Sequence, residues 1–437
     1  MRILWLKSDL LLPLDKGGKL RTWHLMRHLA RQHEITYLAF AEPGTPREHI
    51  DGMKEVAARV ETIERSDAPK GSFQFYVEAA THLVDPLPYA CGKYRSSAYR
   101  AKLKALLDEQ PFDLLVCDFL FPAVNLPDDL PCPSVMFTHN VESEIWRRHA
   151  ETKTGALSKW LYNAQYKRML RYEGEQLARF DGVLAVSDAD AQTFERLYPD
   201  AIDQPVHVVQ TGVDTEFFKP RIPNPESRTP ALVFTGSMDW LPNEDAMQYF
   251  HREILPLIRA EEPDVQLSIV GRAPTPAVRK LAEDDGITVT GRVDDVRPFI
   301  EEAAVYVVPL RIGGGTRLKI FEAMAMGKAV VSTTVGAEGL PVVNGQHVLL
   351  ADEPRTFARD VVRLIRDVDR RRQMEAAARA LVTERFDWRA VARDLEAALV
   401  DIADRGLRDA DSAVSQSEVN PQSAILNPQS SLPTGSL

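Results

Sequence analysis

The stretch RIGGGTRLKIFEAMAMGKAVVSTTVGAEGL at 311–340 reads as a strand end, three consecutive glycines, a helix and a second strand. Glycines at such a turn let the backbone approach a ligand closely. The helix start supplies unpaired N–H groups and the positive end of a dipole, which together suit a diphosphate. The stretch therefore predicts an α/β domain with a phosphate site at a strand-to-helix turn.

Three charged side chains follow these glycines on the predicted helix. Arg317 and Lys319 would add positive charge, and preorganised cations stabilise the negative charge that grows on a leaving phosphate. The two cations do not share a helix face, so one of them could be solvated instead. Glu322 can accept two hydrogen bonds from vicinal ribose hydroxyls. The competing interpretation is a glycine-rich helix entry with ordinary surface charges.

Short apolar runs alternate with helix-period segments on both sides of this stretch, which predicts two domains built on parallel sheets. The rhythm breaks at the proline-rich KPRIPNPESRTP of 219–230. Neither half carries G-x-G-x-x-G, so a nicotinamide or flavin dinucleotide is not indicated. The predicted strands are Ile3–Leu6, Ile35–Phe40, Leu114–Cys117, Ser134–Thr138, Gly182–Val186, Ala231–Thr235, Val265–Val270, Ile287–Val289, Ala304–Val308, Ala329–Ser332 and Val348–Leu350.

Length and composition agree with this division. A chain of 437 residues suits two α/β domains, and 44% hydrophobic with 27% charged residues is ordinary globular usage. A net charge of −10 argues against a nucleic-acid binder. Three cysteines without a C-x-x-C pair predict neither a disulfide framework nor a zinc site, and favour a reducing cytoplasm. We expect no signal peptide and no membrane-spanning segment.

Two motifs of the first half fall where open α/β sheets carry functional groups. Gly17 and Gly18 lie between the first strand and the first helix, with Lys19 and Arg21 as nearby cations. His139 follows an apolar strand at its carboxyl end. A plain strand-to-helix turn and a structural histidine are the alternatives.

Several motifs in order, FTGSMDWLPNEDAM, LSIVGRAP and VTGRVDDVRPFIEEAAVYVVPL followed by the 311–340 stretch, make the chain resemble the family-4 retaining glycosyltransferases. The resemblance covers most of positions 1–405. It implies the GT-B fold, in which two Rossmann-like parallel-sheet domains face each other across a cleft. We expect an acceptor-side domain over 1–210, a nucleotide-sugar-binding domain over 211–385, a helix over 386–407 that crosses back to the first domain, and a disordered tail over 408–437.

The resemblance also implies the site. His139 would be the active-site histidine near the donor sugar or the acceptor, and Lys319 and Arg317 would grip the leaving diphosphate while Glu322 anchors the nucleoside. Gly314 stands where the first of the family's paired glutamates would be, which puts sugar recognition in doubt; a branch of the family reads GGGTR-x-K there. The other expected donor ligands are Gly17, Gly18, Gly236, Arg272, Gly313, Gly314, Gly315 and Thr316.

The resemblance further implies transfer with retention of configuration, without a metal ion or another cofactor, in the synthesis of cell-surface polysaccharide or glycoconjugates. We expect the donor to be a nucleotide diphosphate-sugar. Two rival interpretations are a catalytically silent protein that keeps the same fold for nucleotide binding or partner recognition, and a nucleotide-sugar epimerase. The epimerase would need paired acid and base groups, and Gly314 weakens that interpretation.

Some motifs leave alternatives open. Asn140 and Glu142 could orient acceptor hydroxyls or cap the following helix, and Asn243 is more typical of a helix cap than of a ligand. The segment 147–171 is rich in Lys, Arg and aromatic residues. It could lie on an anionic membrane surface at the inner face of the plasma membrane, or form a solvated helix that covers its own domain.

Overall fold

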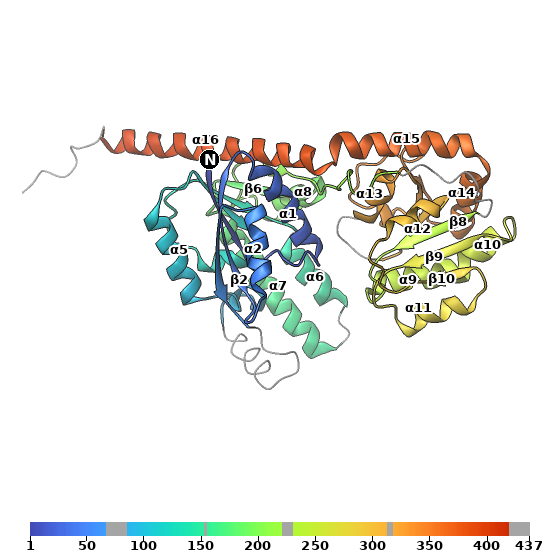
Figure 1. Ribbon diagram of the computed structural model, residues 1–437. Coiled ribbons are helices and arrows are strands. Elements are labelled where there is room, and N and C mark those ends of the chain that lie inside the picture. Colours follow the sequence, from blue (N-terminus) through green and yellow to red (C-terminus); the bar gives the residue numbers. More distant parts are fainter. Residues whose placement is uncertain (67–84, 153–154, 221–229, 313–317, 419–437) are drawn as a thin grey trace, which may run out of the picture.

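The computed structural model describes residues 1–66, 85–152, 155–220, 230–312 and 318–418, which form two domains (Figure 1). Each domain has a parallel sheet with helices packed on both faces. The predicted fold class is therefore confirmed. None of the helices in these ranges is long and apolar enough to span a membrane.

The first domain is built on seven parallel strands in the order β3-β2-β1-β4-β5-β6-β7. Ile3 to Leu6 in the central strand are fully buried, because the sheet is covered on both faces. The sequence analysis did not predict β3, in which charged residues alternate with apolar ones, or the short edge strand β7. The strands are β1 Arg2–Lys7, β2 Glu34–Ala41, β3 Arg59–Glu64, β4 Leu114–Asp118, β5 Ser134–Phe137, β6 Gly182–Ala185 and β7 His207–Val208.

The second domain has six parallel strands in the order β10-β9-β8-β11-β12-β13. Its core holds the fully buried aromatic side chains of Phe234, Phe250 and Tyr306. The strands are β8 Ala231–Thr235, β9 Gln266–Val270, β10 Ile287–Val289, β11 Val305–Val308, β12 Ala329–Ser332 and β13 Leu349–Leu350.

Both sheets reverse their strand order at one point, between β1 and β4 in the first domain and between β8 and β11 in the second. Ligands of open α/β sheets bind outside the carboxyl ends of the strands at such points. Lys7 and Asp118 end the two strands in the first domain, and Gly236 directly follows β8 in the second. The strand order alone therefore predicts a ligand site beside these positions.

Helices connect the strands and pack on the sheets. In the first domain they are α1 Gly17–Leu29, α2 Arg47–Gly52, α4 Tyr89–Gly92, α5 Ser97–Glu109, α6 Glu142–Thr152, α7 Ala156–Leu177 and α8 Asp188–Leu197, with short turns η1 Met53–Glu55 and η2 Phe121–Asn125. In the second they are α9 Leu241–Tyr249, η3 Phe250–Ile254, α10 Leu255–Arg259, α11 Pro276–Lys280, η4 Leu281–Glu283, α12 Arg297–Glu302, α13 Leu318–Ala325, η5 Val335–Ala337, α14 Pro354–Arg366 and α15 Val368–Arg385.

The last helix, α16 Trp388–Glu418, leaves the second domain and lies along the first (Figure 1). Leu395, Leu399 and Ile402 are fully buried in the core of the first domain. Gly182 in β6 makes this packing possible, because a Cβ there would stand 2.5 Å from the Ile402 side chain. The sequence predicts that a disordered tail begins at residue 408, and this starting point is wrong, because the helix continues to Glu418. Residues 401–418 contain no proline to stop it.

The chain crosses between the domains twice, and the two crossings pair with each other. Val213 and Asp387 form a parallel bridge, and Thr215 donates a hydrogen bond to the Asp387 carboxylate. Gly212 packs so closely on Trp388 that a Cβ would lie 2.6 Å from the indole ring. The segment between β13 and the second crossing forms two helices, α14 and α15, because Asp367 separates them and its side chain accepts the Arg370 N–H of α15 at 2.9 Å.

Candidate active site

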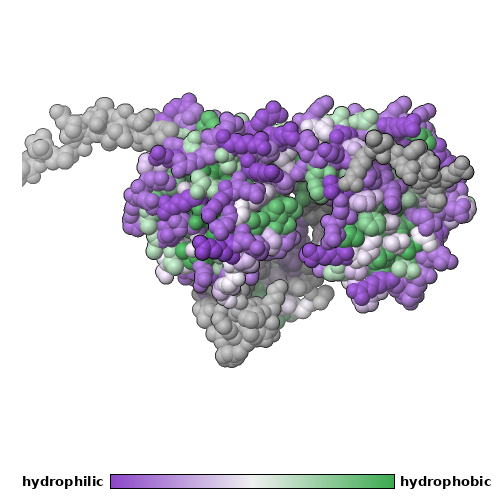
Figure 2. Space-filling view, in the orientation of Figure 1, coloured by the Kyte–Doolittle hydropathy of each residue, from purple (hydrophilic) through white to green (hydrophobic). Residues whose placement is uncertain are grey.

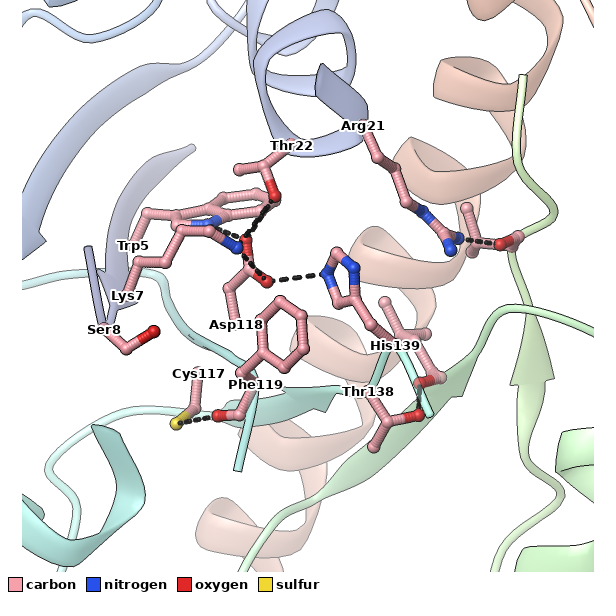
Figure 3. Close-up of polar contacts among 12 residues, drawn as sticks. Trp5, Lys7, Ser8, Arg21, Thr22, Cys117, Asp118, Phe119, Thr138 and His139 are labelled. Carbon is pink, nitrogen blue, oxygen red and sulfur yellow. Dashed lines mark hydrogen bonds and ion pairs between the residues drawn. The ribbon is translucent and has the colours of Figure 1, made fainter. Parts of the chain in front are cut away.

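A buried carboxylate at the end of β4 organises the first-domain half of the site (Figure 3). The Asp118 side chain is fully buried and pairs with Lys7 Nζ at 2.8 Å. Trp5 Nε1 and the Thr22 hydroxyl donate to its other oxygen at 2.9 and 2.7 Å. Burial opposes ionisation, but Lys7 and His139 outweigh it and hold the pKa of Asp118 well below its usual range.

His139, three residues before α6, receives its orientation from this carboxylate. Its Nε2 lies 2.8 Å from Asp118 Oδ1, and its ring stacks on Phe119 with 4.0 Å between centroids. Phe119 can offer that face because its backbone adopts a φ of 78° directly after the strand. Burial lowers the pKa of His139 to about 4 despite the neighbouring carboxylate. The imidazole is therefore neutral near pH 7, donates through Nε2, and presents Nδ1 as an acceptor.

The predicted glycine loop forms the first turn of α1, beside this histidine. A Cβ on Gly18 would lie 3.4 Å from the Phe119 ring and 3.6 Å from His139 Nδ1, whereas Gly17 has open space around it. The preceding Lys16 makes no side-chain cap on α1. Its first N–H groups are thus left for a ligand that accepts hydrogen bonds.

Lys19 and Arg21, the two cations near the start of this helix, lie in different surroundings. Lys19 Nζ pairs with Asp15 at 3.4 Å and lines a separate cavity of about 460 Å³. Arg21 lines the cleft between the domains, where Figure 3 shows its guanidinium on the far side of His139 from Asp118. Only Arg21 is therefore near the predicted site.

The second-domain half lies at the carboxyl ends of β8 and β9. Lys319 Nζ donates to Asn243 Oδ1 at 2.9 Å and lies over the Phe234 ring. Gly236 leaves room for this pair, since a Cβ there would be 2.6 Å from Asn243 Nδ2 and 2.8 Å from Lys319 Nζ. The predicted capping by Asn243 is wrong, because Trp240 is the N-cap of α9 and Asn243 lies inside the helix. Its amide instead ties Lys319 to the Ser237 carbonyl.

The remaining predicted ligands differ in surroundings. Arg272 is exposed after β9 and donates to the Ser237 hydroxyl at 2.9 Å. Glu322 is partly buried on α13, and burial raises its pKa to about 7 while Lys319 opposes the rise. Gly313, Gly314, Gly315, Thr316 and Arg317 lie outside the described residues. The structure thus places Lys319 beside Gly236 and Arg272 beside Ser237.

A cavity of about 350 Å³ joins the two halves. Gly17, Gly18 and His139 line it from the first domain, and Leu318, Glu338 and Gly339 line it from the second. Figure 2 shows the hollow between the domains that contains this cavity. Of the predicted ligands, Gly17, Gly18 and His139 line this cavity, whereas Gly236, Arg272, Lys319 and Glu322 are not among its lining residues.

A second buried carboxylate fixes the loop that carries His139. The Glu173 side chain on α7 accepts the N–H groups of Glu142 and Ser143 at 2.9 and 3.0 Å, so it caps α6 from another helix. Tyr198 donates to the same carboxylate at 2.6 Å. Glu142 is itself buried, and burial together with Glu173 raises its pKa to about 8. Neither Glu142 nor Asn140 is therefore the side chain that caps this helix.

Sequence reasoning missed Asp118, Lys7, Trp5 and Thr22. Polar residues at the ends of the apolar runs LWLK and LLVCD were the available signal, since parallel strands end at one edge of a sheet. Nothing in the sequence indicated that β1 and β4 are neighbours. Among the described residues, no cluster of His, Cys, Asp or Glu could hold a metal ion.

Comparison with known proteins identifies related chains. The family model Glycosyltransferase Family 4 matches residues 16–217, and the model Glycosyl transferases group 1 matches residues 229–367. A phosphatidyl-myo-inositol mannosyltransferase of Mycobacterium leprae is 28% identical over 82% of this chain and 93% of its own. An uncharacterized 44.6 kDa protein in the cps region of Klebsiella pneumoniae is 22% identical over 37% of this chain and 43% of its own. Anabaena HepE, solved with UDP and glucose, superposes with a TM-score of 0.62 at 15% identity over 92% of this chain and 99% of its own.

Proposed function

Because the chain belongs to the family-4 glycosyltransferases, which have the GT-B fold, we propose that it transfers a sugar from a nucleotide diphosphate-sugar to a glycan or lipid-linked acceptor. The cavity that joins Gly18 and His139 to Leu318 and Glu338 carries this proposal, because donor and acceptor must meet between the domains. HepE was solved with UDP and glucose, and the Klebsiella relative is named for a cps region. Both are consistent with the synthesis of a cell-surface polysaccharide or glycoconjugate.

The proposed reaction retains the configuration of the sugar and uses neither a metal ion nor a further cofactor. The bond from the anomeric carbon to the diphosphate oxygen breaks, and the acceptor oxygen bonds to the same face of that carbon. The acceptor proton passes to the leaving phosphate. Lys319, Arg317, Arg272 and the N–H groups at Gly17 and Gly18 would hold the leaving diphosphate, and fixed donors of this kind lower the barrier to its departure.

Two side chains would bind the rest of the donor. The carboxylate of Glu322 would accept hydrogen bonds from the ribose hydroxyls. His139 is neutral near pH 7, so its Nδ1 would accept a hydrogen bond from a sugar hydroxyl beside Gly18. Asp118 would act through His139, by keeping the proton on Nε2.

The first test is a thermal-shift screen of the whole chain against UDP, GDP, ADP, TDP and their sugar conjugates, with and without chelator. A ligand that binds the native state raises the melting temperature. We expect a shift for one base that survives chelator. Lys319→Ala should weaken binding of that nucleotide about 10- to 100-fold, because a hydrogen bond to a charged group contributes about 1.5–3 kcal/mol. Lys280→Ala, at an exposed position on α11, should bind the nucleotide normally.

The outcomes separate the competing functions. No shift with any nucleotide would favour a silent protein over a transferase. Conversion of the donor sugar without any acceptor would favour the epimerase. Once a donor and acceptor are known, the anomeric proton coupling in the NMR spectrum of the product tests retention, and an inverted product would refute it.

We also propose that the first turn of α7 contacts an anionic membrane. Leu157 and Trp160 are 71% and 63% exposed, and Lys159 lies between them. The other apolar residues of the predicted 147–171 surface, Leu161, Tyr162, Tyr166 and Leu170, are partly buried against their own domain. An exposed aromatic and aliphatic pair beside a cation suits the interface of a bilayer.

Flotation with phosphatidylglycerol vesicles tests this contact. The wild-type chain should float, and the Leu157→Ser, Trp160→Ser double variant should stay at the bottom of the gradient. The double variant Leu241→Ser, Leu257→Ser removes exposed leucines from the second domain and should float normally. Equal flotation of all three proteins, or of none, would rule out a membrane surface at α7.

A further inference from the structure

Arg21 is a buried cation with few partners. The side chain is 3% exposed, and its Nη2 donates to the backbone carbonyl of Val209. The guanidinium lies over the Phe137 ring, and its Nε has no hydrogen-bond partner among the described residues. Burial lowers the pKa of Arg21 to about 9 even though Asp118 and Asp190 act on it through space. A guanidinium held out of water without an ion pair is costly, and a ligand that neutralises it would remove that cost.

A second arginine lines the same cavity from α6. Arg148 is exposed and makes no ion pair with the residues that the structure describes. The adjacent Arg147 behaves differently, because it holds Glu144 at 2.7 Å and Glu151 at 2.5 Å. Arg148 thus offers the cavity a guanidinium without a direct ion pair among the described residues, on the same wall as Arg21, although Glu144 and Asp190 act on it through space.

The start of α8 completes this wall. Ser187 caps the helix by accepting the N–H of Asp190, and Ala189 in the first turn lines the cavity. The positive end of a helix dipole adds to the potential there. Asp190 is the one carboxylate on this wall that faces both arginines, and both lower its pKa against the rise that burial causes. Of the other acidic groups of the cavity, Glu144 is paired with Arg147, and Glu338 belongs to the opposite domain.

We propose that Arg21, Arg148 and the first turn of α8 bind an acidic group of the acceptor, either a phosphate or a carboxylate. This inference rests on the proposed function, because it names the chemistry of the acceptor for the same cleft. Guanidinium groups bind both anions through paired hydrogen bonds. We assign the anion to the acceptor rather than to the donor diphosphate, because Arg148 and α8 lie on the first domain whereas the donor's proposed cations Lys319 and Arg272 lie on the second. Gly17 and Gly18 line the same cavity, but they would contact the diphosphate through backbone N–H groups and not through a side-chain charge.

Calorimetric titration of the whole chain tests this assignment. The probes are glucose 6-phosphate, glucuronate and glucose, each added with and without the nucleotide that the thermal-shift screen selects. We expect at least one acidic sugar to bind about 10-fold more tightly than glucose, with the preference falling as salt is added. The two acidic probes distinguish a phosphate from a carboxylate site.

Variants of neighbouring arginines supply the control. Arg148→Ala should lose the preference for the acidic sugar and keep its affinity for the nucleotide, whereas Arg147→Ala should keep both. Arg148→Lys should retain part of the preference, because it keeps the charge without the paired donors. Melting curves of each variant show that it is folded, and Arg148 is exposed, so its replacement should not unfold the chain.

Two results would overturn the proposal. Glucose could bind as tightly as both acidic sugars, in which case the wall recognises hydroxyls. Arg148→Ala could weaken binding of the nucleotide as much as binding of the acidic sugar, in which case the anion at this wall is the donor diphosphate. Failure of every nucleotide to bind would instead refute the proposed function, and the titrations without nucleotide would still report on the acidic site.

Discussion

The Asp118 carboxylate of the first domain is fully buried and has four donors, which are Lys7, His139, Trp5 and Thr22. In the second domain Glu322 is partly buried, and Lys319 is the one positive charge that lowers its pKa. The surroundings move the two carboxyl groups in opposite directions. The pKa of Asp118 falls below its usual range, and the pKa of Glu322 rises to about 7. Four donors from the protein contact the Asp118 carboxylate, whereas the partners that we propose for Glu322 are the ribose hydroxyls of a donor.

The largest effect is expected from cutting the chain so that one domain loses part of its core and the other does not. Truncation after Asp387 removes Leu395, Leu399 and Ile402 from the first domain and keeps Phe386, which belongs to the core of the second. Each lost core side chain costs about 2–5 kcal/mol, so the first domain should no longer fold while the second retains a transition. Calorimetry should show one transition lost.

A chain that ends after Arg408 is the matched control, because it keeps these three side chains and should melt like the full chain. An unchanged melting profile after truncation at Asp387 would mean that α16 does not stabilise the first domain.

The next effect concerns the ion pair at the base of the cleft. Asp118→Asn leaves Lys7 buried at 1% exposure without its counterion, and breaking a buried pair from one side costs about 3–5 kcal/mol. Urea unfolding should report that loss. Adding Lys7→Met to Asp118→Asn should recover much of it, because no buried charge then lacks a partner. A double variant as unstable as Asp118→Asn alone would show that the Asp118 contacts with His139, Trp5 and Thr22 matter more than the pair.

The smallest effect is the pH dependence, which should run in opposite directions in the two halves. The pKa of His139 falls from 6.5 to about 4 on folding. Its contribution to the free energy of unfolding is therefore complete above pH 6.5 and is lost as the pH falls towards 4. The pKa of Glu322 rises from 4.5 to about 7 on folding. Its contribution to the free energy of unfolding is therefore complete below pH 4.5 and is lost as the pH rises towards 7.

Replacing either residue with glutamine should therefore reduce the pH dependence of the free energy of unfolding, each in a different pH range. Glu322→Gln should stabilise the chain at pH 8 by about 1–3 kcal/mol while it weakens nucleotide binding, and His139→Gln should remove part of the acid sensitivity between pH 4 and 6.5. Urea unfolding at several pH values measures both. Parallel curves for wild type and both variants would contradict the assigned shifts.

The sequence was sufficient for the fold and for part of the site. Continuous apolar runs such as Ala329–Ser332 predict buried parallel strands, and the order of motifs predicts the GT-B arrangement. The polar network around Asp118 could not be predicted, because Lys7 and Asp118 come together only when β1 and β4 pair across a long stretch of sequence. The role of Asn243 could not be predicted for a similar reason, since its partner Lys319 lies on a helix that is distant in the sequence.

The paired crossings at Val213 and Asp387 constrain how the two domains can move. A single flexible linker would let the second domain tilt and twist in any direction. Two chain segments that are joined by this bridge, with Gly212 packed on Trp388, hold the domains together more firmly at this point than a single linker would. We therefore expect any relative rotation of the domains to take place about this paired crossing.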